Sequence, residues 1–370
     1  MPKVRTYVQN RTDEINRRLR DLTLELPEAC VDFILYLEKT TQPLTRYVYT
    51  RDILLFLKYL IRENSRFANY TTDSFDYKDF DSITLKELHL FQSYLGYYRD
   101  ENDVVYTNDN LGIMRKLCSL RSFYKFMYRN ERIKQNVTEK LDLPKRHEKP
   151  IIRLEVDEMA RMFDAVDEQD ALTDHQKGFT EKTKKRDLAI ITLFLGTGIR
   201  VSELVGIDIG DVDFELNAFT VTRKGGDQMI LYFSDEVGMA LQDYLEERKE
   251  IKAGEGHENA LFLSMQRKRI NVRSVENMVK KYARIAAPLK TKISPHKLRS
   301  TYGTNLYHET GDIYLVADVL GHKDVNTTRR HYAAMSDDKR RLAASAVKLR
   351  DEPVSQRSGN EDEDSPQQNP

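Results

Sequence analysis

The sequence has few cysteines and no long apolar segment, and both absences exclude whole classes of protein. Two cysteines, Cys30 and Cys118, are too few for a disulfide framework or for a four-cysteine zinc site. No apolar run approaches the roughly 20 residues that a membrane-spanning helix requires. The amino-terminal stretch lacks the apolar segment of a secretory signal. We therefore expect an intracellular protein that has no membrane partner.

Acidic and basic residues cancel over the whole chain, but they are unevenly distributed. Residues 351–370 hold six acidic side chains, one arginine and few apolar residues. We expect this segment to be a disordered acidic tail, because it cannot offset its own ordering entropy. The rest of the chain then carries an excess of five positive charges. A pI near 7 consequently does not argue against a nucleic-acid partner.

Apolar residues recur at helical spacing along most of the first half of the chain. Pro27 can begin a helix, since the N–H that proline lacks would be unpaired there in any case. Thr84 and Glu87 form a T-x-x-E capping box, which indicates the start of another helix. Polar residues 64–81 predict a loop, and no segment predicts a strand. The helices we expect cover about residues 27–39, 44–63, 84–95 and 108–130.

The pattern becomes mixed after Lys140–Pro150, a charged stretch whose prolines indicate an interdomain linker. Two short apolar runs, 218–222 and 229–233, flank a Lys-Gly-Gly-Asp sequence and predict a β-hairpin. Residues 260–263 can add a further strand. Helices are predicted at about residues 155–166, 184–196, 235–251, 272–286, 298–308 and 312–320.

These patterns predict an α-helical first domain and a mainly α second domain with a small β-sheet. The expected parts are a basic amino-terminal extension, the helical domain, a linker, the second domain and the acidic tail. Their predicted bounds are residues 1–25, 26–142, 143–151, 152–350 and 351–370.

Basic side chains line one face of two predicted helices in the first domain. Three of them stand at i, i+4 and i+8, so they share one side of a helix. Such rows neutralise phosphates and release counterions, which gives affinity for DNA without sequence preference. A solvated helix face has the same pattern, so the rows alone are weak evidence. The candidate DNA contacts are Arg51, Lys58, Arg62, Arg121, Lys125 and Arg129.

Four motifs in the second domain carry a more specific signal. They are GTGIRVSEL from residue 196, HKLR from residue 296, LGH from residue 320 and RRHY ending at residue 332. Taken in this order, they resemble the tyrosine recombinase (phage-integrase-like) family. Its catalytic domain carries G-T-G-x-R-x-S-E-L, H-x-L-R, L-G-H and then a nucleophilic tyrosine. The resemblance covers about residues 150–335 and extends weakly over 27–145, which is similar to the family's helical core-binding domain.

The resemblance implies a tyrosine recombinase catalytic fold and a role for each matching residue. Arg200 and Arg299 match the two arginines that grip the scissile phosphate, and Tyr332 matches the nucleophile. The remaining matches are His296 for the first family histidine, His322 for the His-or-Trp position, Lys224 for the mobile hairpin lysine and Glu203 for the supporting acidic residue.

These residue types suit the chemistry of phosphoryl transfer. A tyrosine hydroxyl, with a pKa near ~10, is a poor nucleophile until a base takes its proton and cations stabilise the transition state. His296 can help to take that proton, and Lys224 can protonate the departing 5′-oxygen. Two bidentate guanidiniums bind phosphate oxygens better than lysines. They can replace a divalent metal, so we expect no metal and no cofactor.

Two details depart from the family pattern. Ser300 stands where many members have a histidine after the second arginine. Tyr332 lies ten residues after His322, one more than in some relatives. Tyr302 and Tyr307 therefore remain alternative candidates for the nucleophile.

The leading hypothesis is a site-specific recombinase that forms a 3′-phosphotyrosyl adduct and a Holliday junction. Its role would be chromosome-dimer resolution, or integration and excision of a mobile element. The resemblance implies double-stranded DNA as partner and a homotetramer on two DNA sites, with an accessory or directionality protein as a further possible partner. A predicted helix after Tyr332 either docks on a neighbouring copy or closes its own domain. The expected location is the bacterial cytoplasm, in association with the nucleoid.

Three other hypotheses stay open at this point. A type IB topoisomerase would use related chemistry on one strand, and a non-catalytic DNA-binding protein would keep the fold without the reaction. A metallohydrolase would need ligands from the histidines, but the sequence has no H-E-x-x-H spacing. The histidines available to it are His296, His308, His322 and His331.

Overall fold

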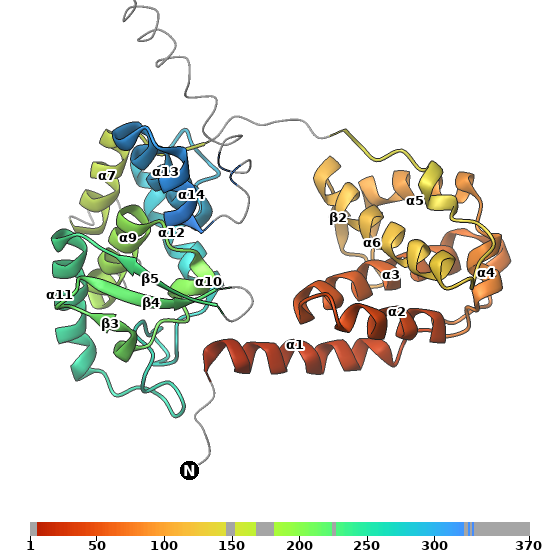
Figure 1. Ribbon diagram of the computed structural model, residues 1–370, viewed down its shortest axis with the longest axis horizontal. Helices are drawn as coiled ribbons and strands as arrows, with labels where there is room; N and C mark the ends of the chain where they lie inside the picture. The colour runs from red at the N-terminus through yellow and green to blue at the C-terminus, as the bar shows by residue number, and fades with distance from the viewer. Residues whose placement is uncertain are drawn as a thin grey trace, which may run out of the picture. The chain divides into compact units, whose positions relative to one another are not determined.

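The computed structural model describes residues 6–145, 152–167, 181–223 and 227–321, together with Val325 and Thr328. The chain divides into two compact units, and the main division in sequence falls at residues 150–151. Figure 1 shows that both units consist mainly of helices and that the second also contains a three-stranded sheet.

The first unit is a helical bundle around an aromatic core. Two helix starts agree with the sequence: Pro27 is the N-cap of the helix that begins at Glu28, and the Thr84 hydroxyl accepts a hydrogen bond from the Glu87 N–H. Pro43, which was not singled out, stands in the first turn of the following helix. Phe33, Phe56 and Phe123 are fully buried at its centre. The helices are α1 (Tyr7–Thr23), α2 (Glu28–Glu38), α3 (Pro43–Glu63), α4 (Tyr77–Ser82), α5 (Leu85–Gly96) and α6 (Asn110–Arg129), with 3₁₀ turns at Ser65–Phe67 and Val137–Lys140.

The first unit also contains a β-hairpin, so the prediction of no strand there was wrong. Strands β1 (Tyr97–Arg99) and β2 (Val105–Thr107) pair antiparallel, with Tyr98 opposite Tyr106. The two tyrosine rings stack with their centroids 5.2 Å apart. Each strand has three residues, which is too short to show an alternating pattern. The cross-strand aromatic pair, rather than a periodic apolar face, stabilises this hairpin.

The prediction of a loop over residues 64–81 was wrong in part, because α4 and a 3₁₀ turn lie within it. The carboxylate of Asp76 caps α4 by accepting hydrogen bonds from two backbone N–H groups. Phe67, Phe75 and Phe80 are buried and their rings contact one another in sequence. Three widely spaced rings anchor this segment to the core although its composition is polar.

The second unit packs its helices beside a small sheet whose strand order is β3-β4-β5. The predicted hairpin is present, and the Arg223 N–H closes it by donating to the Asp227 carbonyl at 2.7 Å. Ala260 and Leu263 each make an isolated bridge, so residues 260–263 do not form the further strand that the sequence suggests. The elements are α7 (Val156–Asp167), α9 (Lys184–Thr197), α10 (Val201–Leu204), α11 (Asp235–Glu250), α12 (Val272–Ala286), α13 (Pro295–Thr310), α14 (Ile313–Leu320), β3 (Val212–Asp213), β4 (Ala218–Thr222) and β5 (Gln228–Tyr232), with 3₁₀ turns at Glu181–Thr183 and Ile209–Asp211.

Helix α9 lies at the centre of the second unit and is packed against α7, α11 and α13. Ala189, Ile190 and Ile191 are fully buried at consecutive positions, which lie about 100° apart around the helix axis. A helix that is apolar all round is stable only where other elements enclose it. Its carboxyl end is therefore held firmly, and that end leads directly into the GTG motif. In the parts of the chain that the structure describes, no helix is both long and apolar enough to cross a membrane.

Candidate active site

The turn after α9 determines where Arg200 lies. Gly198 takes a left-handed backbone conformation, with φ at +62°, which glycine adopts without strain. Gly196 allows α11 to approach closely, since a Cβ at this position would lie 2.5 Å from the Val237 side chain. Thr197 reinforces the turn by donating its hydroxyl to a backbone carbonyl one helical turn earlier, at 2.6 Å. The chain therefore turns sharply, and Arg200 becomes the first residue before α10.

Glu203 holds Arg200 through both its backbone and its side chain. One carboxylate oxygen accepts the Arg200 backbone N–H at 3.0 Å, and the other accepts Nη1 at 2.7 Å. The Glu203 side chain is 4% exposed, against 35% for Arg200. Hydrogen bonds between charged groups are short and strong, so the buried carboxylate fixes the orientation of the guanidinium.

The second arginine, Arg299, converges on the same place from α13. It is 5% exposed, and its Nη1 donates to the Gly198 carbonyl at 2.5 Å. Its Nη2 donates to the Leu320 carbonyl, which also accepts Nη2 of Arg200 at 3.2 Å. Arg200 further donates to the Gly321 carbonyl at 3.1 Å. Both guanidiniums thus meet at the carboxyl end of α14, where backbone carbonyls lack intrahelical partners and the helix dipole is negative.

His296 lies in the first turn of α13, which begins at Pro295, and its side chain is exposed. Arg299 follows three residues later and therefore occupies the same side of the helix. The N–H groups of a first helical turn favour a nearby anion. The amino-terminal end of α13 is therefore suited to bind a phosphate group on the side of the helix that carries Arg299.

Three of the predicted site residues, Lys224, His322 and Tyr332, lie outside the described part of the chain. The described residues next to the first two are Arg223, which follows β4, and Gly321, whose carbonyl accepts from Arg200. Two of the four histidines that the metallohydrolase hypothesis would use, His322 and His331, also lie outside that part. Within the described residues, no group of three or more His, Cys, Asp and Glu side chains is placed to hold a metal ion.

The alternative nucleophiles Tyr302 and Tyr307 both lie on α13, against the cluster formed by Val316 and Leu320. Tyr302 is partly buried, and this burial raises its pKa above the ordinary value for tyrosine. A raised pKa makes the phenol harder to ionise and therefore a weaker nucleophile near neutral pH.

The sequence did not reveal that the Leu320 carbonyl is the acceptor shared by both arginines. A backbone oxygen leaves no mark in a sequence beyond the residues that shape its turn. The signal was the glycine of the LGH motif, because Gly321 has φ at +58° and ends α14 there.

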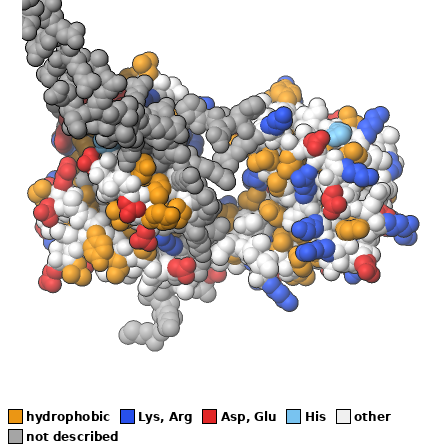
Figure 2. All heavy atoms as spheres, turned by 45° about the horizontal axis from the view of Figure 1, so that its top comes forward, with side chains coloured by type: hydrophobic (Ala, Val, Ile, Leu, Met, Phe, Trp, Pro, Cys, Tyr) orange, Lys and Arg blue, Asp and Glu red, His pale blue; other side chains and the backbone are white. Residues whose placement is uncertain are grey.

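The six candidate DNA contacts in the first unit fall into two groups. Arg51, Lys125 and Arg129 are exposed, and Figure 2 shows many lysine and arginine side chains on the visible face of this unit. The other three have partners inside the unit: Lys58 pairs with Glu101, Arg62 donates to the Arg99 carbonyl, and Arg121 donates to the Leu141 carbonyl. Arg62 is exposed as well, so the groups differ in their ion pairs and hydrogen bonds: the first group can approach phosphates without breaking such contacts.

This division into side chains with and without partners inside the unit predicts that substitutions at neighbouring positions of α6 affect DNA binding differently. Replacing both Lys125 and Arg129 by alanine is expected to weaken DNA binding and to reduce the slope of log K against log salt by up to about 1.8, since each lost phosphate contact removes about 0.9. Arg121→Ala is the control, because it removes the contact with Leu141 and should lower thermal stability while leaving the salt slope unchanged. Fluorescence anisotropy across a salt series measures the slopes. An equal loss of slope in both variants would contradict the division.

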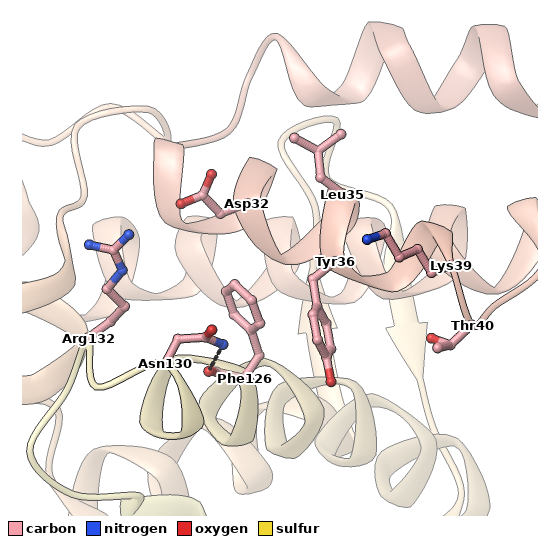
Figure 3. A pocket seen from close by; sticks show the side chains of 8 residues that line it. All are labelled: Asp32, Leu35, Tyr36, Lys39, Thr40, Phe126, Asn130 and Arg132. Atoms are coloured by element: carbon pink, nitrogen blue, oxygen red, sulfur yellow. Dashed lines mark hydrogen bonds between the residues drawn. The ribbon is translucent and has the colours of Figure 1, made fainter.

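A groove of about 590 Å³ lies in the first unit between α2 and the end of α6 (Figure 3). Leu35 and Tyr36 border it and are largely exposed. Its one carboxylate, Asp32, already accepts the Tyr77 hydroxyl at 2.8 Å. Burial and this hydrogen bond raise the pKa of Tyr77 to about 12. The single carboxylate of the groove is thus engaged by Tyr77, and the candidate active site is the arginine pair of the second unit.

Two guanidiniums that converge on one point beside a helix amino terminus form a site suited to phosphodiesters, and comparison with known proteins identifies the family. The model of the phage integrase family matches residues 153–339. Tyrosine recombinase XerC of Caldanaerobacter subterraneus subsp. tengcongensis is 33% identical over 339 residues, which cover 89% of each chain. Tyrosine recombinase XerS of Streptococcus thermophilus is 30% identical over 324 residues, or 80% of this chain and 88% of the relative. The chain therefore belongs to the phage integrase family and is an enzyme of the tyrosine recombinase class.

Solved structures agree on the fold. The Tn1549 transposon integrase in complex with transposon right end DNA has a TM-score of 0.61 at 20% identity, over 86% of this chain and 98% of that chain. The XerH site-specific recombinase bound to difH substrate, in a pre-cleavage complex, has a TM-score of 0.59 at 19% identity, over 90% of this chain and 94% of that chain. The fold class expected from the sequence, a helical domain followed by a mainly α catalytic domain with a small sheet, is confirmed.

Proposed function

We propose that this enzyme is a site-specific recombinase that cleaves and rejoins double-stranded DNA through a 3′-phosphotyrosyl adduct on Tyr332. The observation that carries the proposal is the convergence of Arg200 and Arg299 on the end of α14. Arg200 commits three hydrogen bonds to Glu203, Leu320 and Gly321. A guanidinium has five N–H donors, so Arg200 can offer further donors to a phosphate oxygen.

The proposed roles follow from the charge that develops during cleavage. When the Tyr332 oxygen attacks the phosphorus, the two non-bridging oxygens gain negative charge, and preorganised arginines stabilise it at no cost of reorganisation. The buried Glu203 carboxylate keeps Arg200 in place by accepting hydrogen bonds from it. His296 helps to take the phenolic proton, His322 donates a hydrogen bond to the phosphate, and Lys224 protonates the departing 5′-oxygen. No step requires a metal ion, since the arginines supply the positive charge.

The bond between tyrosine and phosphate conserves the free energy of the broken phosphodiester. A 5′-hydroxyl from a second DNA duplex can then attack it without ATP. Two rounds of this exchange, one for each pair of strands, pass through a Holliday junction. We propose that four copies act on two DNA sites, that a directionality or accessory protein assists them, and that the reaction takes place in the bacterial cytoplasm, where its DNA lies.

The biological role proposed is chromosome-dimer resolution or the integration and excision of a mobile element. Support comes from the names of the relatives, which include tyrosine recombinases XerC and XerS and a transposon integrase. Both roles use the same chemistry and differ in the DNA site. Inverted repeats of about a dozen base pairs around a short spacer near the gene would identify that site.

The experiment uses a duplex of that site with a nick placed beside the scissile phosphate. Cleavage then releases a short strand that cannot return, and the enzyme remains covalently attached. We expect a protein–DNA adduct that withstands SDS, that forms in the presence of EDTA and whose modified peptide contains Tyr332. Specific binding without any adduct would instead indicate a DNA-binding protein that does not react.

A pair of plasmid assays distinguishes recombination from topoisomerase activity. A plasmid with two sites should be converted to deletion or inversion products, because cut ends are exchanged between duplexes. A supercoiled plasmid with one site should show little relaxation. Efficient relaxation without exchange would contradict the proposal and favour the type IB topoisomerase hypothesis.

A further inference from the structure

The ring of Tyr302 fills the space between the turn after α9 and the end of α14. Tyr302 follows Arg299 by three residues on α13, so the two side chains share one side of the helix. A Cβ built on Gly198 would lie 2.5 Å from Cδ1 of Tyr302 and 2.9 Å from Cδ2 of Leu320. The aromatic ring and the leucine side chain therefore both lie directly against Gly198.

Gly198 and Leu320 also supply the two carbonyl oxygens that accept hydrogen bonds from Arg299. One nitrogen of its guanidinium donates to Gly198 and the other donates to Leu320. Gly198 and Leu320 thus each have two neighbours. Their Cα or side-chain atoms contact the Tyr302 ring, and their carbonyl oxygens accept hydrogen bonds from Arg299. The guanidinium is planar and its donors form a rigid fork, so it can bind both oxygens only at a suitable separation.

The hydroxyl of Tyr302 contributes little to this arrangement. Among the residues that the structure describes, no hydrogen bond to it is found, whereas the guanidinium of Arg299 donates to two backbone carbonyls. The ring packs with Val316 and Leu320 in a small apolar cluster. The shape of the ring, rather than its polar group, is what separates the turn from α14.

We propose that Tyr302 is a positioning residue whose ring sets the distance between the Gly198 and Leu320 carbonyls and so places Arg299 for the scissile phosphate. Arg200 shares the Leu320 carbonyl, so the same ring also affects the first arginine. The inference rests on the proposed cleavage reaction. Removing the ring leaves a cavity into which α14 can shift, and a displacement of about 1 Å can cost about 10²-fold in rate.

The test measures single-turnover cleavage of the nicked duplex and, separately, the Kd for the same DNA. Tyr302→Phe keeps the ring and should cleave at a rate within about twofold of the wild type. Tyr302→Ala should cleave about 10²-fold more slowly with an unchanged Kd. Tyr302→Leu keeps apolar bulk and protects the fold, and it should be slower by about tenfold. Loss of rate in the alanine and leucine variants, with recovery in the phenylalanine variant, is the expected pattern.

Val316→Ala is the matched control, because Val316 is fully buried in the same cluster on α14. It removes two methyl groups in place of a ring and leaves a smaller cavity, so it should lower thermal stability while slowing cleavage much less than Tyr302→Ala. Equal slowing by Val316→Ala and Tyr302→Ala would reduce Tyr302 to a structural role and overturn the inference. Cleavage at the wild-type rate by Tyr302→Leu or Tyr302→Ala would overturn this inference and leave the proposed function standing. The absence of any adduct with the wild-type enzyme would overturn the proposed function together with it.

Discussion

Tyr332→Phe is expected to abolish the covalent adduct while leaving the affinity for DNA unchanged. The variant loses one oxygen atom, which is the atom proposed to bond to phosphorus, and keeps the aromatic ring. Loss of a nucleophile commonly costs several orders of magnitude in rate, so cleavage should fall by about 10⁴-fold or more. Incubation with the nicked duplex, followed by denaturing electrophoresis, measures the adduct, and fluorescence anisotropy measures binding.

Tyr307→Phe provides the matched control for this loss. Tyr307 lies on α13, the helix that also carries Arg299, and it packs on the Val316 and Leu320 cluster. Removing its hydroxyl should leave the adduct yield at the wild-type level. The assignment of the nucleophile would be wrong if Tyr307→Phe lost the adduct and Tyr332→Phe kept it. Loss of DNA affinity in Tyr332→Phe would instead point to a binding role for that hydroxyl.

The sequence motifs pointed to Arg200 and Arg299 as residues of one site, although they could not predict how the two meet. Arg200 and Arg299 are separated by about a hundred residues, and the structure brings both to the carbonyl of Leu320. Part of that information lies in the glycines of two motifs, because Gly198 and Gly321 both have positive φ where a helix ends.

Side-chain partners within the first unit were beyond the reach of helical periodicity. The periodic row in α3 included Lys58 and Arg62, yet the hairpin formed by β1 and β2 supplies partners to both. Because that hairpin has strands of three residues, it left no alternating pattern, and its contacts with α3 could not be foreseen. A charge pattern predicts which side of a helix is basic, whereas tertiary contacts decide which of those charges are available to DNA.

Backbone acceptors explain a further part of the difference between sequence and structure. Several arginines of the second unit bind carbonyl oxygens in place of carboxylates, and a sequence gives no sign of such pairs. Arg248 is as buried as Arg299, and it donates to the carbonyls of Glu258 and Ala260 in a loop away from the motifs. Burial and carbonyl binding alone therefore do not mark a catalytic arginine. The position of Arg299 beside Arg200 and the first turn of α13 is what distinguishes it.

Arg299→Lys is accordingly expected to slow single-turnover cleavage by about 10²–10³-fold, which is the usual effect of losing one preorganised donor to a developing oxyanion. Lysine keeps the positive charge but has no fork, so it cannot join the carbonyls of Gly198 and Leu320 and also reach the phosphate. Binding of DNA should change much less than the rate, because the charge remains and the lost interaction strengthens in the transition state.

Arg248→Lys is the control for this substitution, since both arginines are 5% exposed and both donate to backbone carbonyls. It should lower the thermal stability of the protein through the loss of the contacts with Glu258 and Ala260, while the folded enzyme cleaves at the wild-type rate. A comparable fall in rate for the two variants would show that buried arginines act here through stability alone. A large fall confined to Arg299→Lys would tie the guanidinium at the end of α14 to the chemical step.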